Sequence, residues 1–391
     1  MYYPREMEAV LREAAAEFRV VVLTGARQTG KSTLLERLFA KSHRYVSLDD
    51  SRALRLARED PDLFFEQYPP PLILDEIQYA PGLLSAVKLR ADQTRKKGQF
   101  LLTGSQQFTM MRNLQETLAG RAALFQLLPM SLAEGRAASR TYRYRALIGS
   151  YPGLVVPGKH HPERWYASYL ATYVEKDVQP HYQVKKIAHF RDLLFLLAAR
   201  CSQLLNYSAL SSDLGVSMPA VKSWVRILEV SQIVYLLRPY YVNLGSRIVK
   251  SPKLYFCDTG LLNYLLGNRE ESALTQGAHA GALFENFVIQ EVLKRYLNQG
   301  RTPPIFYYRT NNGLEVDLVI EEKAGVIRPC EIKRTKNPHP AMLQPIQRLR
   351  SLNKKKSVLI KEGILVTLLE GRSLLARDGV ACGLKEFLLH I

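Results

Sequence analysis

A glycine-rich segment near the start of the chain has the spacing of a phosphate-binding loop. Residues 25–32, GARQTGKS, match the pattern GxxxxGK[ST], in which glycines let backbone N–H groups turn towards a phosphate. The apolar run 19–23 precedes the loop and a helix is expected over 32–41, whose N-terminus adds its positive dipole end. We predict that ATP binds through Gly25, Ala26, Arg27, Gln28, Thr29, Gly30, Lys31, Ser32 and Thr33.

Four side chains near this loop have expected roles in ATP chemistry. Lys31 would reach the β- and γ-phosphates, and Ser32 would ligate Mg²⁺. The apolar run 72–74 is followed by paired carboxylates. We expect Asp75 to hold Mg²⁺ through water and Glu76 to act as the catalytic base that polarises the attacking water.

Two further residues are candidates for contact with the γ-phosphate or its transition state. Thr103 follows the apolar run 100–102, where a sensor hydroxyl is needed, although a simple strand-to-turn exit is the alternative. Arg121, in Leu-Ala-Gly-Arg, could supply positive charge to the site of its own chain or of a neighbouring subunit. An ordinary surface arginine is the alternative interpretation.

Residues 207–228 have the pattern of a helix-turn-helix. A short helix ends at Gly215, and Ser217 can cap the next helix. On that second helix, the residues at i, i+3, i+4 and i+7 form one apolar face: Val221, Trp224, Val225 and Leu228. The residues that face away are Lys222, Ser223 and Arg226. Strand-like runs at 233–237 and 253–256 would form a wing, so we expect this face to contact DNA. A protein-binding winged helix is the alternative.

A group of acidic residues near the C-terminus could hold a divalent metal ion. Asp317 lies on an alternating strand, and Glu331 and Lys333 lie two residues apart on another, so they share a face. Glu285, on the preceding helix, could complete the metal site. Lys333 could then activate a water for attack on a phosphodiester. A structural hairpin with cross-strand Glu–Lys pairs is the alternative.

The elements that must position these residues indicate an α/β fold. Short apolar runs at 20–23, 45–48, 72–74, 100–102 and 123–127 alternate with helical segments, which predicts a parallel sheet. We expect four blocks, listed in chain order: an ATPase core at 1–133, a basic helical linker at 134–189, a winged helix-turn-helix at 190–267, and a strand-rich C-terminal domain at 275–391.

Composition narrows the classes of partner. The 391 residues carry a formal net charge of +18, which favours nucleic acid as a partner. The run 193–199 is the longest fully apolar stretch and is far too short to span a bilayer. The N-terminus lacks the pattern of a signal peptide, and the four cysteines show no metal-binding or disulfide spacing. We therefore expect a cytoplasmic protein with no membrane partner.

Together, these segments resemble one protein family. The segments are GARQTGKSTLL, LILDEIQYAPGLLSAVKLRAD, FLLTGSQ, LAGR, YVEKDV, SPKLYFCDTGLLNYLLG, GALFENFV and LEVDLVI. The chain is similar over about residues 1–335 to bacterial and archaeal AAA-type (AAA_14) ATPases with a C-terminal domain of unknown function, DUF4143. The resemblance implies a P-loop NTPase of the AAA+/ASCE class with sheet order 5-1-4-3-2, a winged helix, and a fold similar to PD-(D/E)xK nucleases, among them Holliday junction resolvases.

The resemblance also assigns roles residue by residue. It places Lys31, Ser32, Asp75 and Glu76 in ATP chemistry. It places Asp317, Glu331 and Lys333 in the nuclease-like pattern, with Glu285 as the acid of the helix.

We expect an ATP- and Mg²⁺-dependent protein that binds double-stranded or branched DNA, remodels it or moves along it, and works as a homo-oligomer, a ring or a dimer. An ATP-gated nuclease and an ATP-switched regulator of the toxin–antitoxin kind remain the alternative hypotheses.

Overall fold

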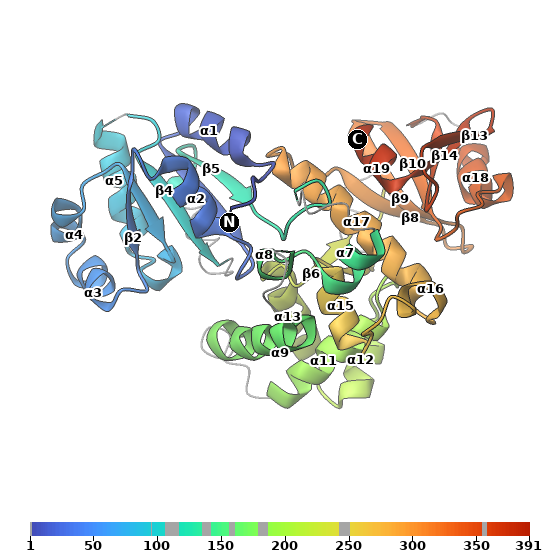
Figure 1. Cartoon of the computed structure of the whole chain (residues 1–391), viewed down its shortest axis with the longest axis horizontal. Coiled ribbons are helices and arrows are strands. Elements are labelled where there is room, and N and C mark those ends of the chain that lie inside the picture. Colours follow the sequence, from blue (N-terminus) through green and yellow to red (C-terminus); the bar gives the residue numbers. More distant parts are fainter. Residues whose placement is uncertain are drawn as a thin grey trace.

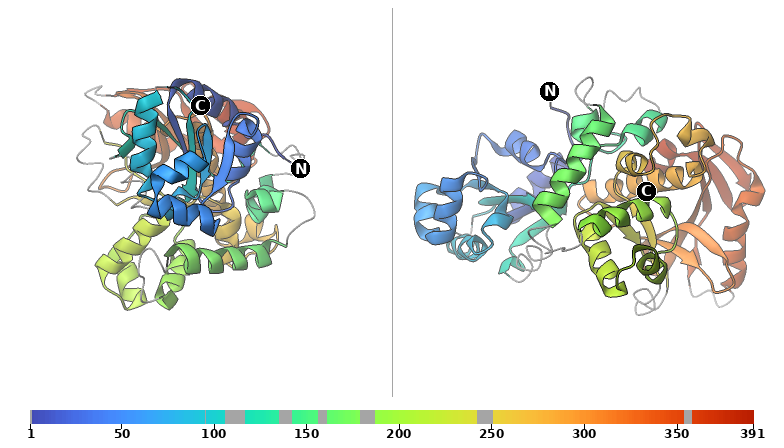
Figure 2. Two further views of the ribbon diagram at one scale, coloured as in Figure 1. Left: turned by 90° about the vertical axis from the view of Figure 1, so that its left-hand side faces the viewer. Right: turned by 90° about the horizontal axis from the view of Figure 1, so that it is seen from below.

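The computed structural model describes residues 2–94, 96–105, 117–134, 142–155, 161–178, 187–241, 251–353 and 358–391. Two sheets lie towards opposite ends of the long axis, with a helical middle part below and between them (Figure 1). The two turned views agree with this arrangement (Figure 2).

The N-terminal part is a five-stranded parallel sheet. Its strands are β1 (Val20–Gly25), β2 (Arg44–Ser47), β3 (Leu72–Asp75), β4 (Phe100–Ser105) and β5 (Ala122–Gln126). They lie in the order β2-β3-β4-β1-β5, and every pairing is parallel. Counted from the other edge, this is the order 5-1-4-3-2 that we predicted, so the expected P-loop sheet is confirmed.

Helices cover both faces of this sheet because alternate side chains of each strand point to opposite sides. Val20 and Val22 of β1 belong to one core, whereas Val21 and Leu23 belong to another. The first core is closed by α3 (Ser51–Glu59), α4 (Pro61–Gln67) and α5 (Leu83–Thr94), and the second by α1 (Glu8–Glu17) and α2 (Lys31–Phe39). A short 3-10 helix, η1 (Ile77–Tyr79), follows β3.

The middle part is mostly helical. Its helices are α7 (Tyr142–Ile148), α8 (Pro152–Val155), α9 (Pro162–Tyr173), the π-helical turn η2 (Val174–Val178), α11 (Ile187–Ala199), α12 (Tyr207–Leu214), α13 (Met218–Val230), α15 (Thr259–Leu265) and α16 (Ala273–Gln276). Two antiparallel strands, β6 (Val234–Leu237) and β7 (Lys253–Phe256), follow α13. Side chains of α7, α8 and α9 are buried in the same core as those of α11 to α15. The segment expected as a linker therefore contributes helices to this core.

The C-terminal part contains a mixed seven-stranded sheet. Its strands are β8 (Ile305–Arg309), β9 (Glu315–Lys323), β10 (Val326–Ile332), β11 (Leu359–Ile360), β12 (Gly363–Thr367), β13 (Arg372–Ala376) and β14 (Gly379–Gly383). The order is β13-β14-β12-β10-β9-β8, with β11 beside β10. Side chains of η3 (Pro340–Leu343) and α18 (Gln344–Leu352) pack on one face, and those of α19 (Leu384–Leu389) and α17 (Ala280–Asn298) on the other.

Helix α17 connects the three parts. Its buried side chains lie in the core that also contains α7, β7 and β10. Beyond its C-terminal end, Gly300 approaches Phe125 of β5 and Val10 of α1. Figure 1 shows α17 running between the N-terminal sheet and the C-terminal sheet. In the part of the chain that the structure describes, no helix has the length and apolarity needed to cross a membrane.

Candidate functional site

The phosphate-binding loop lies between β1 and α2, as its motif requires. Gly30 has φ 90° and is the N-cap of α2, which places the helix N-terminus at the end of the loop. Gln28 also has a positive φ of 62°. The Lys31 ammonium is folded back onto the loop and donates hydrogen bonds to the carbonyl oxygens of Gly25 at 3.1 Å and Ala26 at 2.9 Å. The oxygen atoms of a bound phosphate could accept hydrogen bonds from Lys31 in place of these two carbonyl oxygens.

The paired carboxylates lie at the carboxyl end of β3, on the same sheet edge as the loop. Asp75 is buried, and its Oδ2 accepts a 2.6 Å hydrogen bond from the Tyr45 hydroxyl. Among the described residues, its Oδ1 is buried with no hydrogen-bond partner. A buried carboxylate oxygen left in this state is costly unless a ligand satisfies it. Asp75 together with the half-buried Ser32 therefore fits a magnesium ion bound with nucleotide.

Glu76 has an unusual backbone and an unusual environment. Its φ is 57°, in the left-handed region, and Gln78 donates a hydrogen bond to its side chain. Burial raises the pKa of Glu76, although the Gln78 hydrogen bond and the charges of Lys31 and Arg27 counteract part of that rise. A raised pKa brings a carboxylate closer to the range in which it can accept a proton from water near neutral pH.

Thr103 and Arg121 lie at opposite ends of the parallel strands of the N-terminal sheet. Thr103 pairs with Leu23 of β1, next to the loop, and its buried hydroxyl has no partner among the described residues. Arg121 instead precedes β5 beside Val20 at the start of β1, about 17 Å from the loop at a rise of roughly 3.3 Å per residue. Its guanidinium pairs with Asp92 at 2.8 Å. In this structure the Arg121 guanidinium therefore faces Asp92 and not the loop of its own chain.

Residues from outside the motif hold the loop in place. The amide oxygen of Gln232, between α13 and β6, accepts a 3.0 Å hydrogen bond from the backbone N–H of Ala26. Arg5 donates 2.8 Å hydrogen bonds to the carbonyl oxygens of Thr29 and Leu128. The same guanidinium pairs with Glu134 at 3.0 Å, and both side chains are almost completely buried.

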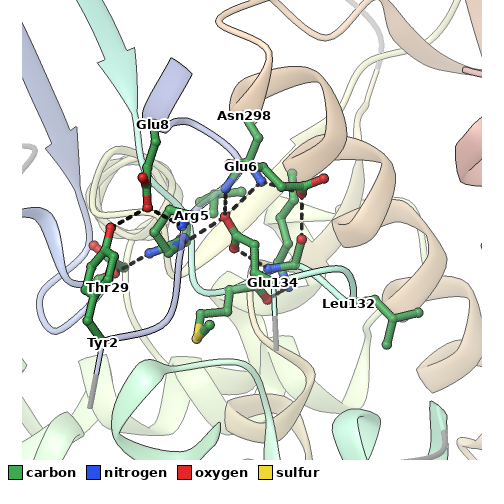
Figure 3. Close-up of polar contacts among 12 residues, drawn as sticks. Tyr2, Arg5, Glu6, Glu8, Thr29, Leu132, Glu134 and Asn298 are labelled. Carbon is green, nitrogen blue, oxygen red and sulfur yellow. Dashed lines mark hydrogen bonds and ion pairs between the residues drawn. The ribbon is translucent and has the colours of Figure 1, made fainter. Parts of the chain in front are cut away.

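Hydrogen bonds through Glu6 connect the Arg5–Glu134 pair to α17 (Figure 3). Glu134 accepts hydrogen bonds from the backbone N–H groups of Glu6 at 2.8 Å and Ser131 at 2.7 Å. Asn298, at the end of α17, donates to Glu6 Oε2 at 3.0 Å. The loop is thus linked through buried polar groups to the middle part by Gln232 and to α17 by Arg5.

The proposed DNA-contacting residues lie where the helical periodicity predicted. Lys222, Ser223 and Arg226 on α13 are exposed. The opposite face is buried and consists of Val221, Trp224, Val225 and Leu228. Ser217 caps α13 by accepting a 3.4 Å hydrogen bond from the N–H of Ala220, and Gly215 ends α12 with φ 62°.

The acidic residues of the C-terminal part are brought together around two lysines. Asp317 Oδ2 accepts hydrogen bonds from Lys333 Nζ at 2.8 Å and from the Ile332 N–H at 2.9 Å. Lys333 also contacts Glu331 Oε2 at 2.9 Å. Burial, and then the charge of Asp317, raise the pKa of Glu331 to about 8. Lys333 and then Lys253 hold the pKa of Asp317 below its usual value, against the effect of burial.

Sequence reasoning missed Lys253, Glu315 and Gln232 as parts of these sites. Lys253 lies in β7, where all four side chains are buried, and its ammonium lies 2.8 Å from Glu315 Oε1. A lysine inside so short an apolar strand was a signal of buried pairing. Gln232 gave no such signal, because its role depends on the packing of the middle part against the loop.

Comparisons with known proteins match three successive segments of the chain, which correspond to its N-terminal, middle and C-terminal parts. Residues 17–135 match the AAA domain (AAA_14), residues 139–272 match a domain of unknown function (DUF8612), and residues 280–380 match another (DUF4143). A match to the AAA domain implies nucleotide binding.

The proteins that are similar to the chain include the following two relatives and a solved structure. An uncharacterized protein of Mycobacterium tuberculosis is 31% identical over 338 residues, which are 85% of this chain and 74% of that protein. An uncharacterized protein of Haemophilus influenzae is 22% identical over 71% of this chain and 74% of its own length. A Walker-type ATPase of Pyrococcus abyssi is 14% identical, covers 67% of this chain and 95% of its own, and has a TM-score of 0.42, too low to support an inference.

The order of the three matched domains and the extent of the mycobacterial similarity lead to one assignment: the chain belongs to the family of AAA-domain proteins that carry DUF8612 in the middle and DUF4143 at the C-terminal end.

Proposed function

We propose that this protein hydrolyses ATP with Mg²⁺ and couples the turnover to remodelling of, or translocation along, double-stranded or branched DNA. The observation that carries the coupling is the hydrogen bond between Gln232 and Ala26. Gln232 lies two residues beyond the end of α13, the helix with the exposed basic face, and Ala26 belongs to the phosphate-binding loop. If the loop changes conformation when nucleotide binds or leaves, this hydrogen bond would transmit the displacement to the end of that helix.

The ATP half of the proposal rests on groups gathered at one sheet edge. Lys31 and the N–H groups at the start of α2 would hold the phosphates, and Ser32 and Asp75 would hold Mg²⁺. The ion supplies charge neutralisation on the phosphates when it is bound. Glu76 would orient a water and take its proton, and the Thr103 hydroxyl would donate to the γ-phosphate. The unpartnered oxygen atoms of Asp75 and Thr103 support these roles.

The DNA half rests on charge and on the arrangement of α11, α12, α13, β6 and β7, which follow one another in the order of a winged helix. Residues 181–260 contain ten lysine and arginine residues against four acidic ones. Exposed lysine, serine and arginine side chains on the second helix of such a unit are suited to phosphate contacts.

The experiment compares ATPase rates without DNA and with linear duplex, forked and four-way DNA, each with Mg²⁺. We expect DNA to raise the rate in the wild-type protein, with no turnover in Glu76→Gln. A wild-type rate that is identical under all four conditions would overturn the coupling and leave only nucleotide hydrolysis.

A second candidate function is an ATP-switched regulator, which needs no neighbouring subunit. The Gln232–Ala26 contact favours it, because that contact joins the loop to α13 within one chain. A motor instead needs a ring or a dimer, in which Arg121, distant from its own ATP site, completes the site of the next copy. Sedimentation with and without ATP separates the two: assembly on ATP supports the motor, and a constant monomer supports the switch.

A further inference from the structure

A lysine from the middle part lies in the centre of the acidic cluster of the C-terminal part. Lys253 comes from β7, and its side chain is 4% exposed. Its ammonium lies 2.9 Å from Glu285 Oε1, 2.8 Å from Glu315 Oε1 and 4.0 Å from Asp317 Oδ1. Three carboxylates from α17 and β9 thus surround one buried positive charge.

Other side chains form further hydrogen bonds and ion pairs with the acidic residues of this region. The Tyr255 hydroxyl, two residues along β7 and on the same face as Lys253, donates to Glu285 Oε1 at 2.7 Å. Lys333 pairs with the far side of Asp317 and with Glu331. In the described part of the chain, no three His, Cys, Asp or Glu side chains form a group that could hold a metal ion.

These contacts do not fit a divalent ion at this position. Such an ion needs several oxygen ligands at about 2.0 to 2.6 Å. Oxygens of Glu285 and Glu315 already contact Nζ of Lys253, and Asp317 Oδ2 and Glu331 Oε2 contact Nζ of Lys333. A divalent ion among these carboxylates would be repelled by the ammonium groups of both Lys253 and Lys333, and little water screens the charge of the buried Lys253. The ammonium in turn is held firmly, since a buried charge deprived of its partners is destabilising.

We propose that Lys253 is the resident cation of this cluster and takes the place that a divalent metal would have in a nuclease. The cluster consists of Glu285, Glu315, Asp317 and Glu331. The C-terminal part then binds no metal at this position and cleaves no phosphodiester there. Its acidic residues serve instead to fasten β7, the last strand of the winged-helix unit, to α17 and β9.

Removal of the lysine should open a metal site. We expect Lys253→Ala to bind one more Mn²⁺ than the wild-type protein, measured by electron paramagnetic resonance without nucleotide, and Mn²⁺ to raise its melting temperature. Adding Asp317→Asn to this variant should abolish the gain. Lys323→Ala, which removes an exposed lysine from β9 of the same sheet, is the matched control and should gain no Mn²⁺. A folded Lys253→Ala variant that gains none contradicts the proposal.

The wild-type protein provides a test that does not depend on the folding of that variant. It should nick no linear, forked or four-way DNA with Mg²⁺ or Mn²⁺. Metal-dependent nicking that disappears in Asp317→Ala would overturn the proposal. Both measurements omit ATP, so they are independent of the proposed ATPase function. An ATPase that also nicks DNA would disprove the lysine proposal alone.

Discussion

Gln232 and Ala26 lie 206 residues apart in the chain and are joined by a buried hydrogen bond of 3.0 Å. Gln232 has a φ of 57°, and among the described residues its Nε2 has no partner. The amide is thus anchored through one atom to the phosphate-binding loop and has a donor left over in a buried position. An unpaired buried donor is costly, which favours a ligand or a second loop conformation that satisfies it.

Gln232→Ala should uncouple ATP turnover from DNA. Without the amide, the loop loses its link to α13, so the ratio of the DNA-stimulated to the basal ATPase rate should fall towards one. Phosphate release with and without duplex DNA measures this ratio. Gln203→Ala removes an exposed glutamine of the same part and should keep the wild-type ratio. An unchanged ratio in Gln232→Ala would assign the coupling to other contacts, such as those of Arg5.

The two substitutions in the ATP site should differ in kind. Glu76→Gln removes the base but leaves the phosphate cradle, so ATP should still bind while turnover falls by roughly 10²- to 10⁴-fold. Lys31→Ala removes a positive charge from the phosphates and should weaken binding itself. Equilibrium binding of a fluorescent ATP analogue, together with phosphate release, separates the effects. Hydrolysis by Glu76→Gln at the wild-type rate would disprove its assignment as the base.

Removal of Lys222 and Arg226 should reduce the salt dependence of DNA binding. Each phosphate contact contributes nearly one unit to the slope of log affinity against log salt, so the double alanine variant should lose about two units. Binding should weaken alike for all sequences. Arg12→Ala with Lys41→Ala removes the same charge from exposed positions of the N-terminal part and serves as the control. A slope that does not change would favour a protein partner for α13.

Glu331→Gln should change how stability depends on pH. Burial raises the pKa of Glu331 to about 8, and Asp317 adds to the rise while Lys333 opposes it. The unfolded chain releases this proton near pH 4.5 but the folded chain retains it, so the contribution to stability is present below that pH and is lost as pH rises towards 8. Burial alone would lower the pKa of Lys253 and Lys333, but the neighbouring acids, Asp317 among them for both, raise these pKa values, so both lysines stay charged throughout.

The free energy of unfolding in urea, measured at pH 5.5, 7 and 8.5, tests this. Glu331→Gln carries no such proton, so its stability relative to wild type should improve as pH rises. Glu370→Gln, at an exposed position of the same part, should follow the wild-type curve. Parallel curves for wild type and Glu331→Gln would show that Glu331 is ionised throughout.

Arg5→Ala should destabilise the fold more than other arginine substitutions. It leaves the buried Glu134 carboxylate without its ion pair and frees the carbonyl oxygens of Thr29 and Leu128. Loss of one partner of a buried pair costs about 3–5 kcal/mol. Urea unfolding measures the difference, and Arg12→Ala on the exposed side of α1 should change it by less than about 0.5 kcal/mol. Equal values for both variants would contradict the role of this pair.

The amino-acid sequence by itself determined the elements whose rules are local. The glycines of the loop, the cap at Ser217 and the two faces of α13 depend on residues at most seven positions apart, and the structure has them as predicted. The five apolar runs became five parallel strands for the same reason: a strand buried on both faces is marked by its own composition.

Tertiary structure decided which of these local features meet. Arg121 immediately precedes β5 of the sheet that carries the loop, but it lies at the opposite end of the strands from the loop, which only the direction of β5 relative to β1 establishes. Lys253 reaches acids 32 or more residues away, and Gln232 reaches a loop in another domain. Such contacts depend on how separate cores pack against one another. No periodicity within a segment carries that information, because the free energy of the contact belongs to the pair of surfaces and not to either segment alone.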